Sequence, residues 1–301
     1  MKDVFLSQQP TIFQKCTGIT VQEFDQLVKD VLPRYLEAAH QHLQRPERQR
    51  ASGAGHPFEL EKRDHVLLTL VGLRLYPIPE VLGDLLAVSD STVSRLLERV
   101  LPLLEQAGRD TMRLPDPGKK RCRQLSALLH AIPEVAVGVD SFEQRVPRPA
   151  PDKRHFSGKQ QQNTLKSQVT VEGQTGRIVD TSGSVAGPTP DLTLLKQSGV
   201  LVRLPADQGA IGDLGYRGMD KLSPLAFIAR RTPRGKPHPA EAQPHNTAFS
   251  AFRVIVEQTI GRKHRFQCLS PMDRNHRRHH TARVAAVAGL VNRQPIFSLA
   301  C

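Results

Sequence analysis

The stretch Val135-Ala136-Val137-Gly138-Val139-Asp140 is a short, uninterrupted apolar run that ends in an aspartate. A run of this length and composition predicts a buried β-strand with Asp140 at its end. A second run, Ala210-Ile211-Gly212, leads into Asp213 in the same way. Further along the chain, Glu257 lies within residues 248–262, whose apolar side chains recur at helical spacing. The sequence therefore predicts two aspartates at strand ends and a glutamate on a helix.

Three carboxylates that converge in space form a set of oxygen ligands for a hard divalent cation. Asp140, Asp213 and Glu257 are therefore candidate metal ligands, because a fold can bring strand ends and a helix together. A plainer interpretation of Glu257 stays open. Arg253 precedes it by four residues, and an ion pair at this spacing is a common surface arrangement on helices.

Further patterns predict the elements around these residues. Strands are expected at residues 167–171, 176–179 and 224–228. A helix is expected to begin at Asp191, whose side chain can cap the backbone amides of the first turn. Residues 229–247 are rich in Arg, Pro, His and Gly without apolar periodicity, so we expect an exposed basic loop there.

Three helical patterns with a tight turn between the second and the third occur earlier in the chain, at residues 64–75, 79–86 and 90–104. Pro79 suits a first helical turn, and Ser89 can cap the last helix. The pattern predicts a helix-turn-helix, although an ordinary three-helix bundle also fits it. The start of the last helix would present small polar side chains and an arginine to the major groove of DNA, namely Ser91, Thr92, Ser94 and Arg95.

The composition favours a polyanionic partner. Lys and Arg outnumber Asp and Glu by 42 to 29, which gives a formal net charge of +13. Each phosphate that a basic side chain neutralises releases condensed counterions. A basic protein without such a partner is the simpler alternative.

Cysteine usage and the lack of targeting segments favour a cytoplasmic protein. The four cysteines form no CxxC pair, so neither a zinc ribbon nor a disulfide framework is indicated. The sequence shows neither the apolar segment of a signal peptide nor a run of about 18 apolar residues. We therefore expect a location in a reducing cytoplasm and no membrane partner.

Several short segments follow one another in a fixed order. They are Val139-Asp140-Ser141-Phe142-Glu143, Phe156-Ser157-Gly158-Lys159, Thr164-Leu165-Lys166-Ser167-Gln168, Gly212-Asp213-Leu214-Gly215-Tyr216-Arg217-Gly218, Arg253-Val254-Ile255-Val256-Glu257-Gln258-Thr259-Ile260-Gly261 and Gly289-Leu290-Val291-Asn292. Leu73-Arg74-Leu75-Tyr76 and Val88-Ser89-Asp90-Ser91-Thr92-Val93-Ser94-Arg95 precede them. In this order, the segments resemble the DDE transposases of bacterial insertion sequences, in the branch related to the Harbinger superfamily. The resemblance runs from about residue 60 to residue 294.

The resemblance implies an α/β (α+β) fold, in which an RNase H-like mixed sheet flanked by helices follows an all-α domain. The expected divisions are a helical DNA-binding domain at residues 1–107, with the helix-turn-helix at about 61–104, a linker at 108–132 and a catalytic domain at 133–297.

The resemblance also implies that Asp140, Asp213 and Glu257 are the catalytic triad. They would hold Mg²⁺, with Mn²⁺ as a substitute, as two ions that clamp the attacking and leaving oxygens of a phosphodiester. Relatives usually show a His-Asp pair where this chain has Pro190-Asp191, so the histidine is missing. Asp191 is either a further metal ligand or a helix cap.

Basic side chains near these segments are candidate DNA contacts. Beyond the helix-turn-helix they are Lys159, Lys166, Arg217, Arg277 and Arg278. The run from Asp273 to His280 is expected to be a basic DNA face, with a histidine metal site as the less favoured alternative.

The sequence thus predicts a transposase that binds inverted terminal repeats and catalyses metal-dependent cleavage and strand transfer of double-stranded DNA. Its partners would be transposon ends, target DNA and further copies of the chain. Two alternatives stay open: a domesticated or inactive DNA-binding regulator, and a metal-dependent nuclease without transposition.

Overall fold

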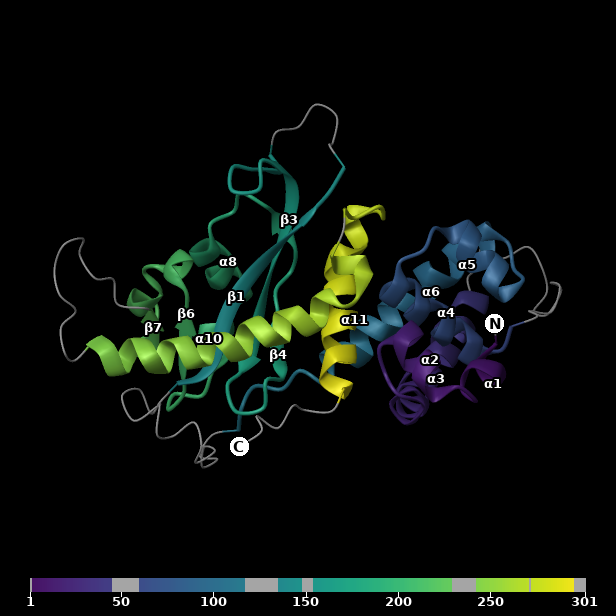
Figure 1. The fold of residues 1–301 in the computed structure, drawn as a ribbon, viewed down its shortest axis with the longest axis horizontal. Helices are drawn as coiled ribbons and strands as arrows, with labels where there is room; N and C mark the ends of the chain where they lie inside the picture. The colour runs from purple at the N-terminus through teal and green to yellow at the C-terminus, as the bar shows by residue number, and fades with distance from the viewer. Residues whose placement is uncertain are drawn as a thin grey trace.

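The computed structural model describes residues 2–44, 60–116, 135–147, 154–228, 242–270 and 272–294. Helices from the N-terminal third lie at one end of the molecule, and a mixed sheet with its covering helices lies at the other (Figure 1). Helix α11 (His280–Arg293) stands between these two parts. The predicted α/β class, with helices before the sheet, is confirmed.

Six helices make up the N-terminal part within the described residues. They are α1 (Asp3–Leu6), α2 (Pro10–Thr17), α3 (Val21–Leu43), α4 (Lys62–Leu75), α5 (Pro79–Leu86) and α6 (Asp90–Arg109). Helices α4 to α6 are the three predicted for the helix-turn-helix. Pro79 lies in the first turn of α5, and the Ser89 side chain caps α6 by accepting a hydrogen bond of 3.2 Å from the Thr92 amide.

The described strands pair in the order β2-β3-β1-β6-β7, and β4 and β5 also pair with β3. Their bounds are β1 (Val135–Arg145), β2 (Phe156–Ser157), β3 (Gln162–Glu172), β4 (Ile178–Thr181), β5 (Val185–Ala186), β6 (Gly209–Gly212) and β7 (Ala226–Ile228). Strand β1 is antiparallel to β3 and parallel to β6, so the sheet is mixed as predicted.

The remaining elements cover or connect the strands. They are α8 (Asp191–Ser198), α9 (Val200–Arg203), η1 (Leu214–Tyr216), η2 (Met219–Lys221), α10 (Ala242–His264), η3 (Gln267–Leu269) and η4 (Arg277–His279). None of the described helices is long and apolar enough to span a membrane.

Two segments differ from the sequence-based expectation. Strand β1 continues five residues beyond Asp140, because β3 pairs with it as far as the contact of Arg145 with Thr164. The prediction of an exposed loop at residues 229–247 is wrong for its last six residues, because residues 242–247 belong to α10. Residues 229–241, like residues 117–132 of the predicted linker, lie outside the described part of the chain.

Helix α10 and helix α8 lie on opposite faces of the sheet. On one face, Phe252 and Val256 of α10 pack so closely on Gly138 that a Cβ atom there would collide with both. On the other face, Val137 and Val139 join a separate apolar cluster with Leu195 of α8. Because side chains alternate along a strand, Asp140 is directed to the face of α10 and Ser141 to the face of α8.

A close helix crossing connects the two parts of the molecule. Gly108 of α6 and Gly289 of α11 meet so tightly that a Cβ atom on Gly289 would overlap the backbone of Gly108. One apolar core runs from the N-terminal helices through α11 to the face of the sheet under α10. The C-terminal end of α6 is therefore fixed against the helix that borders the sheet (Figure 1).

Candidate active site

Asp140 and Asp213 lie side by side where the parallel pairing of β1 with β6 ends. Val139 of β1 pairs with Gly212, the last residue of β6, and each aspartate directly follows one of these two residues. Both line a small cavity of about 30 Å³, together with Arg253 and apolar residues of α10. A cavity of this size holds one small ion or water molecule. The predicted convergence of these two carboxylates is therefore present in the structure.

The environment of Asp140 disfavours its negative charge. Burial raises its pKa from the ordinary 3.8 to about 6, and the charges of Asp213 and Asp191 add to this effect. The backbone amide of Ser141 and the guanidinium of Arg253 oppose it. A carboxylate with this pKa lacks a sufficient counter-charge, which a bound divalent cation would supply.

Asp191 is the first residue of α8, but its side chain does not cap this helix. Instead, its Oδ1 atom accepts hydrogen bonds from Ser141 Oγ at 2.8 Å and from Lys166 Nζ at 3.0 Å. The helix-cap alternative for Asp191 is therefore not realised. The carboxylate faces β1 and β3 instead.

Gly215 and Tyr216 show how closely these groups gather. A Cβ atom on Gly215 would collide with Oδ2 of Asp191 and would lie 3.0 Å from Oδ1 of Asp213. The hydroxyl of Tyr216 is fully enclosed beside the same carboxylates. Burial raises the pKa of Tyr216, the nearby charges of Asp191, Asp140 and Asp213 raise it further, and the neighbouring Ser141 side chain opposes this rise.

Glu257 is not part of this cluster. Its side chain is 53% exposed and forms an ion pair of 2.7 Å with Arg253, which is the surface arrangement that the sequence also allowed. Arg253 in turn lines the cavity of Asp140 and Asp213. Among the residues that the structure describes, no three His, Cys, Asp or Glu side chains are close enough to coordinate one ion.

The candidate DNA contacts of the helix-turn-helix lie at the accessible start of α6. Ser91, Ser94 and Arg95 are exposed, and Thr92 is half-buried. Arg95 donates a hydrogen bond of 3.2 Å to Ser91 Oγ. These side chains therefore lie together at the N-terminal end of α6.

The other basic candidates differ in accessibility. Lys159, Arg217 and Arg278 are exposed, and Arg277 is half-buried. Lys166 is buried, with its Nζ atom bound to Asp191 and to the carbonyl of Thr189. Arg278 also reaches Glu98 of α6 at 3.3 Å, which places it beside the helix-turn-helix.

The run from Asp273 to His280 is not uniformly exposed, and the expectation of a continuous basic face is wrong at both ends. Asp273 is fully buried and forms an ion pair with Arg283. His280 is also fully buried, between Ser184 Oγ and Gln144 Oε1, and burial lowers its pKa to about 3. Both side chains hold the C-terminal helix in place.

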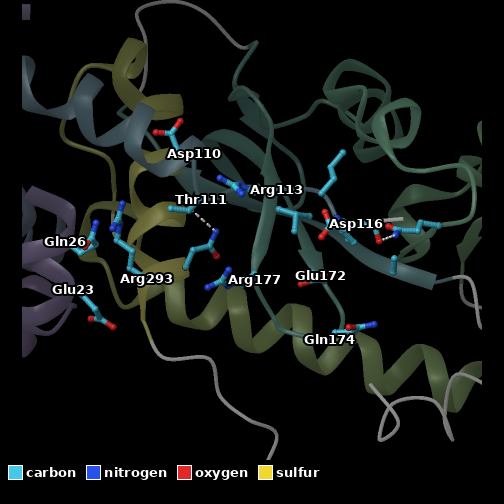
Figure 2. Close-up of a pocket in the computed structure, with 16 residues that line it drawn as sticks. Glu23, Gln26, Asp110, Thr111, Arg113, Asp116, Glu172, Gln174, Arg177 and Arg293 are labelled. Atoms are coloured by element: carbon cyan, nitrogen blue, oxygen red, sulfur yellow. Dashed lines mark hydrogen bonds between the residues drawn. The ribbon is translucent and has the colours of Figure 1, made fainter. Parts of the chain in front are cut away.

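A larger cavity of about 580 Å³ lies elsewhere, at the junction of the two parts. Figure 2 shows Glu23 and Gln26 from the helical part on one side and Glu172 and Arg177 from the sheet on the other. Ala136 lines it, so it adjoins the N-terminal end of β1. Asp140 and Asp213 do not line it, and the candidate active site is therefore the smaller cavity.

Comparison with known proteins agrees with this geometry. The family described as DDE superfamily endonuclease matches residues 139–292, which include both strand-end aspartates, Asp191 and Glu257. The chain belongs to this family. The helix-turn-helix of DDE superfamily endonucleases also matches, at residues 58–110, which contain α4 to α6.

A curated relative supports the same assignment for this DDE superfamily endonuclease. The "Probable transposase for insertion sequence element IS702" of Microchaete diplosiphon is 27% identical over 281 residues, which cover 93% of each chain. A solved structure, the Mos1 mariner paired end complex with Mn, covers 83% of this chain and 99% of its own at 10% identity, with a TM-score of 0.19. The family implies the use of a divalent metal ion.

The residues present fit such an ion in part. Asp140 and Asp213 supply two adjacent oxygen donors to one small cavity. Sequence reasoning did not single out Ser141 or Tyr216. Their signal was available, because Ser141 follows Asp140 on the opposite strand face and Tyr216 follows Asp213 by one short turn.

Proposed function

We propose that this DDE superfamily endonuclease is a transposase that binds inverted terminal repeats through α4 to α6 and cuts and joins DNA at Asp140, Asp213 and Glu257. The observation that supports this most is the pair of aspartates side by side on parallel strands within the matched family region. Phosphodiester transfer needs concentrated negative ligands of this kind and no protein nucleophile.

The carboxylates of Asp140 and Asp213, with Asp191 beside them, would hold Mg²⁺ or Mn²⁺, and the apolar residues of α10 that line the cavity would shield the ion from bulk water. When bound, two such ions activate the attacking oxygen and stabilise the leaving oxygen. The protein supplies the ligands, their fixed spacing and the positive charge of Arg253. With the ion bound, the Asp140 carboxyl would be deprotonated. The positive charge of the ion would counteract the negative charges of Asp213 and Asp191, which raise the pKa of Asp140.

Glu257 is proposed as the third ligand after it leaves Arg253. Both side chains of the pair are more than half exposed, and an exposed ion pair contributes at most about 1 kcal/mol, so a divalent ion can compete for the carboxylate. Arg253, once released, lies beside the cavity and is available to a phosphate of the DNA.

DNA recognition is proposed for the start of α6, with Ser91, Thr92, Ser94 and Arg95 facing base edges in the major groove. Lys159, Arg217, Arg277 and Arg278 would contact phosphates. Joining two transposon ends requires two active sites on one DNA assembly, so we propose a homo-oligomer that acts on chromosomal DNA in the cytoplasm.

The test is cleavage and joining by the purified protein with Mg²⁺ or Mn²⁺, on DNA from immediately outside its own gene. Cutting at repeat ends followed by joining, lost in Asp213→Asn while DNA binding is kept, is the expected result. Specific binding without cutting would identify a DNA-binding regulator. Cutting without end specificity or joining would identify a nuclease.

A further inference from the structure

Lys166 is a buried cation in the middle of β3. Its side chain is only 10% exposed, and its Nζ atom donates to Asp191 Oδ1 at 3.0 Å and to the Thr189 carbonyl at 2.8 Å. Glu143 Oε1 lies 3.6 Å away on the neighbouring strand. A lysine is rarely buried to this extent unless its charge has a partner, so these contacts define the place of its amine.

The contacts of Lys166 fix the orientation of Asp191. Ser141 Oγ and Lys166 Nζ both donate to the same oxygen, Oδ1. Two donors from two different strands leave the carboxylate little freedom to rotate. The second oxygen, Oδ2, is consequently turned toward Gly215.

On that side the oxygen approaches Asp213 of the candidate metal site. The space that a Cβ atom of Gly215 would fill is bordered by Oδ2 of Asp191 and Oδ1 of Asp213. The charge of Asp191 also contributes to the raised pKa of Asp140, which lines the cavity. Glycine at position 215 thus allows the two acidic groups to approach each other.

We propose that Lys166 is a positioning residue which, with Ser141, holds the Asp191 carboxylate beside Asp213, so that its negative charge strengthens the binding of the divalent ion by Asp140 and Asp213 without direct ligation. The inference rests on the proposed metal-dependent function. It gives the buried Lys166 a role at the metal site, in place of the predicted contact with DNA.

The affinity for the metal ion should change in opposite directions on removal of Lys166, depending on whether it acts by its charge or by positioning Asp191. A cation near a cation site weakens metal binding by Coulomb repulsion, so its loss would tighten binding if Lys166 were only a nearby charge. If Lys166 positions Asp191, its loss weakens binding, and residues in the outer shell of a metal site typically contribute a factor of about 10 to 100 in affinity. The sign of the change therefore separates the two roles.

The experiment measures the affinity of Mn²⁺ for the purified full chain by electron paramagnetic resonance of the free ion. Lys166→Met is expected to raise the dissociation constant by about 10- to 100-fold. Lys196→Met, which removes an exposed lysine of α8, is the matched control and is expected to leave it unchanged. In an Asp191→Asn background, Lys166→Met should add less than about twofold, because the residue acts through Asp191.

Ser141→Ala provides a second variant if Lys166→Met does not fold by circular dichroism. It removes one donor to Asp191 and should raise the dissociation constant about two- to tenfold, as expected for one hydrogen bond. If the Lys166→Met protein folds, unchanged or tighter Mn²⁺ binding by it overturns the proposal. If it does not fold, the same result for Ser141→Ala overturns the proposal.

The proposed function fails separately from this inference. Loss of Mn²⁺ binding in Asp140→Asn together with unchanged binding in Lys166→Met would refute only the role of Lys166. A wild-type protein that binds no Mn²⁺, or an Asp140→Asn protein that binds it normally, would refute the metal site and the inference with it.

Discussion

Two ion pairs flank the candidate active site. They have similar lengths, but they differ in how far their side chains are exposed to solvent. Lys166 and Asp191 are 3.0 Å apart, with side chains 10% and 23% exposed, while Arg253 and Glu257 are 2.7 Å apart, with side chains 60% and 53% exposed. The shorter pair lies in water and is easily exchanged, whereas the longer pair is enclosed and fixed. Distance alone therefore does not tell which carboxylate is held in place.

Breaking the enclosed pair should have the largest effect on stability. Lys166→Ala leaves Asp191 and Glu143 without their shared cation, and we expect the free energy of unfolding to fall by about 3 kcal/mol. Urea denaturation monitored by circular dichroism measures this change. A loss below about 1 kcal/mol would mean that the two ion pairs are energetically alike.

Removing the charge of the exposed partner should affect activity and not stability. Glu257→Gln is expected to reduce DNA cleavage by at least about 100-fold, since metal ligands supply several kcal/mol of transition-state stabilisation. Its unfolding free energy should change by less than about 0.5 kcal/mol. Glu105→Gln, in the exposed pair with Arg109, is the control and should cleave normally. Normal cleavage by Glu257→Gln would remove Glu257 from the triad.

Asp140, which borders both pairs, should give the protein a distinct pH dependence. Its pKa is about 6 in the folded chain and close to 3.8 in the unfolded one, so the folded state binds more protons between these values. Stability without metal should therefore fall by about 2 kcal/mol as the pH rises from about 4 to 6. In Asp140→Asn this fall should be absent, and thermal melts in EDTA at both pH values compare the two proteins. Equal pH dependence would mean that Asp140 is well hydrated.

The smallest effect is expected for the exposed cation. Arg253→Ala should change the unfolding free energy by less than about 0.5 kcal/mol, as is usual for exposed pairs four residues apart. Arg109→Ala, which breaks the corresponding pair with Glu105 on α6, should behave in the same way. A loss of more than about 1 kcal/mol in Arg253→Ala alone would contradict the view that the Glu257 carboxylate is free to exchange.

The contrast between the pairs also explains what the sequence could predict. Asp140 and Asp213 follow apolar runs, and the pairing of parallel strands then brings their side chains together. Lys166 lies between Leu165 and Ser167 in a segment with several polar residues, so the local sequence does not indicate that its charge is buried. It is buried because β1 and β5 pair with β3 on both sides of it, which is a property of the sheet order.

The same limit applies to Asp273 and His280. A run rich in Arg and His indicates a solvated surface, yet each of these two side chains has partners far along the chain or on another element, namely Arg283, Gln144 and Ser184. Local pattern predicts elements well when neighbours in the sequence determine them. Long-range pairing of polar groups leaves no periodic signal.

The glycine contact between α6 and α11 holds one end of α6 in a fixed position. Helix α6 has 20 residues, so it spans about 30 Å from the end proposed to read DNA to the end clamped by Gly108 and Gly289. That length corresponds to about nine base pairs of duplex at 3.4 Å each. On the proposed function, a helix anchored at one end would fix the distance between the DNA sequence that the protein recognises and the position that it cuts.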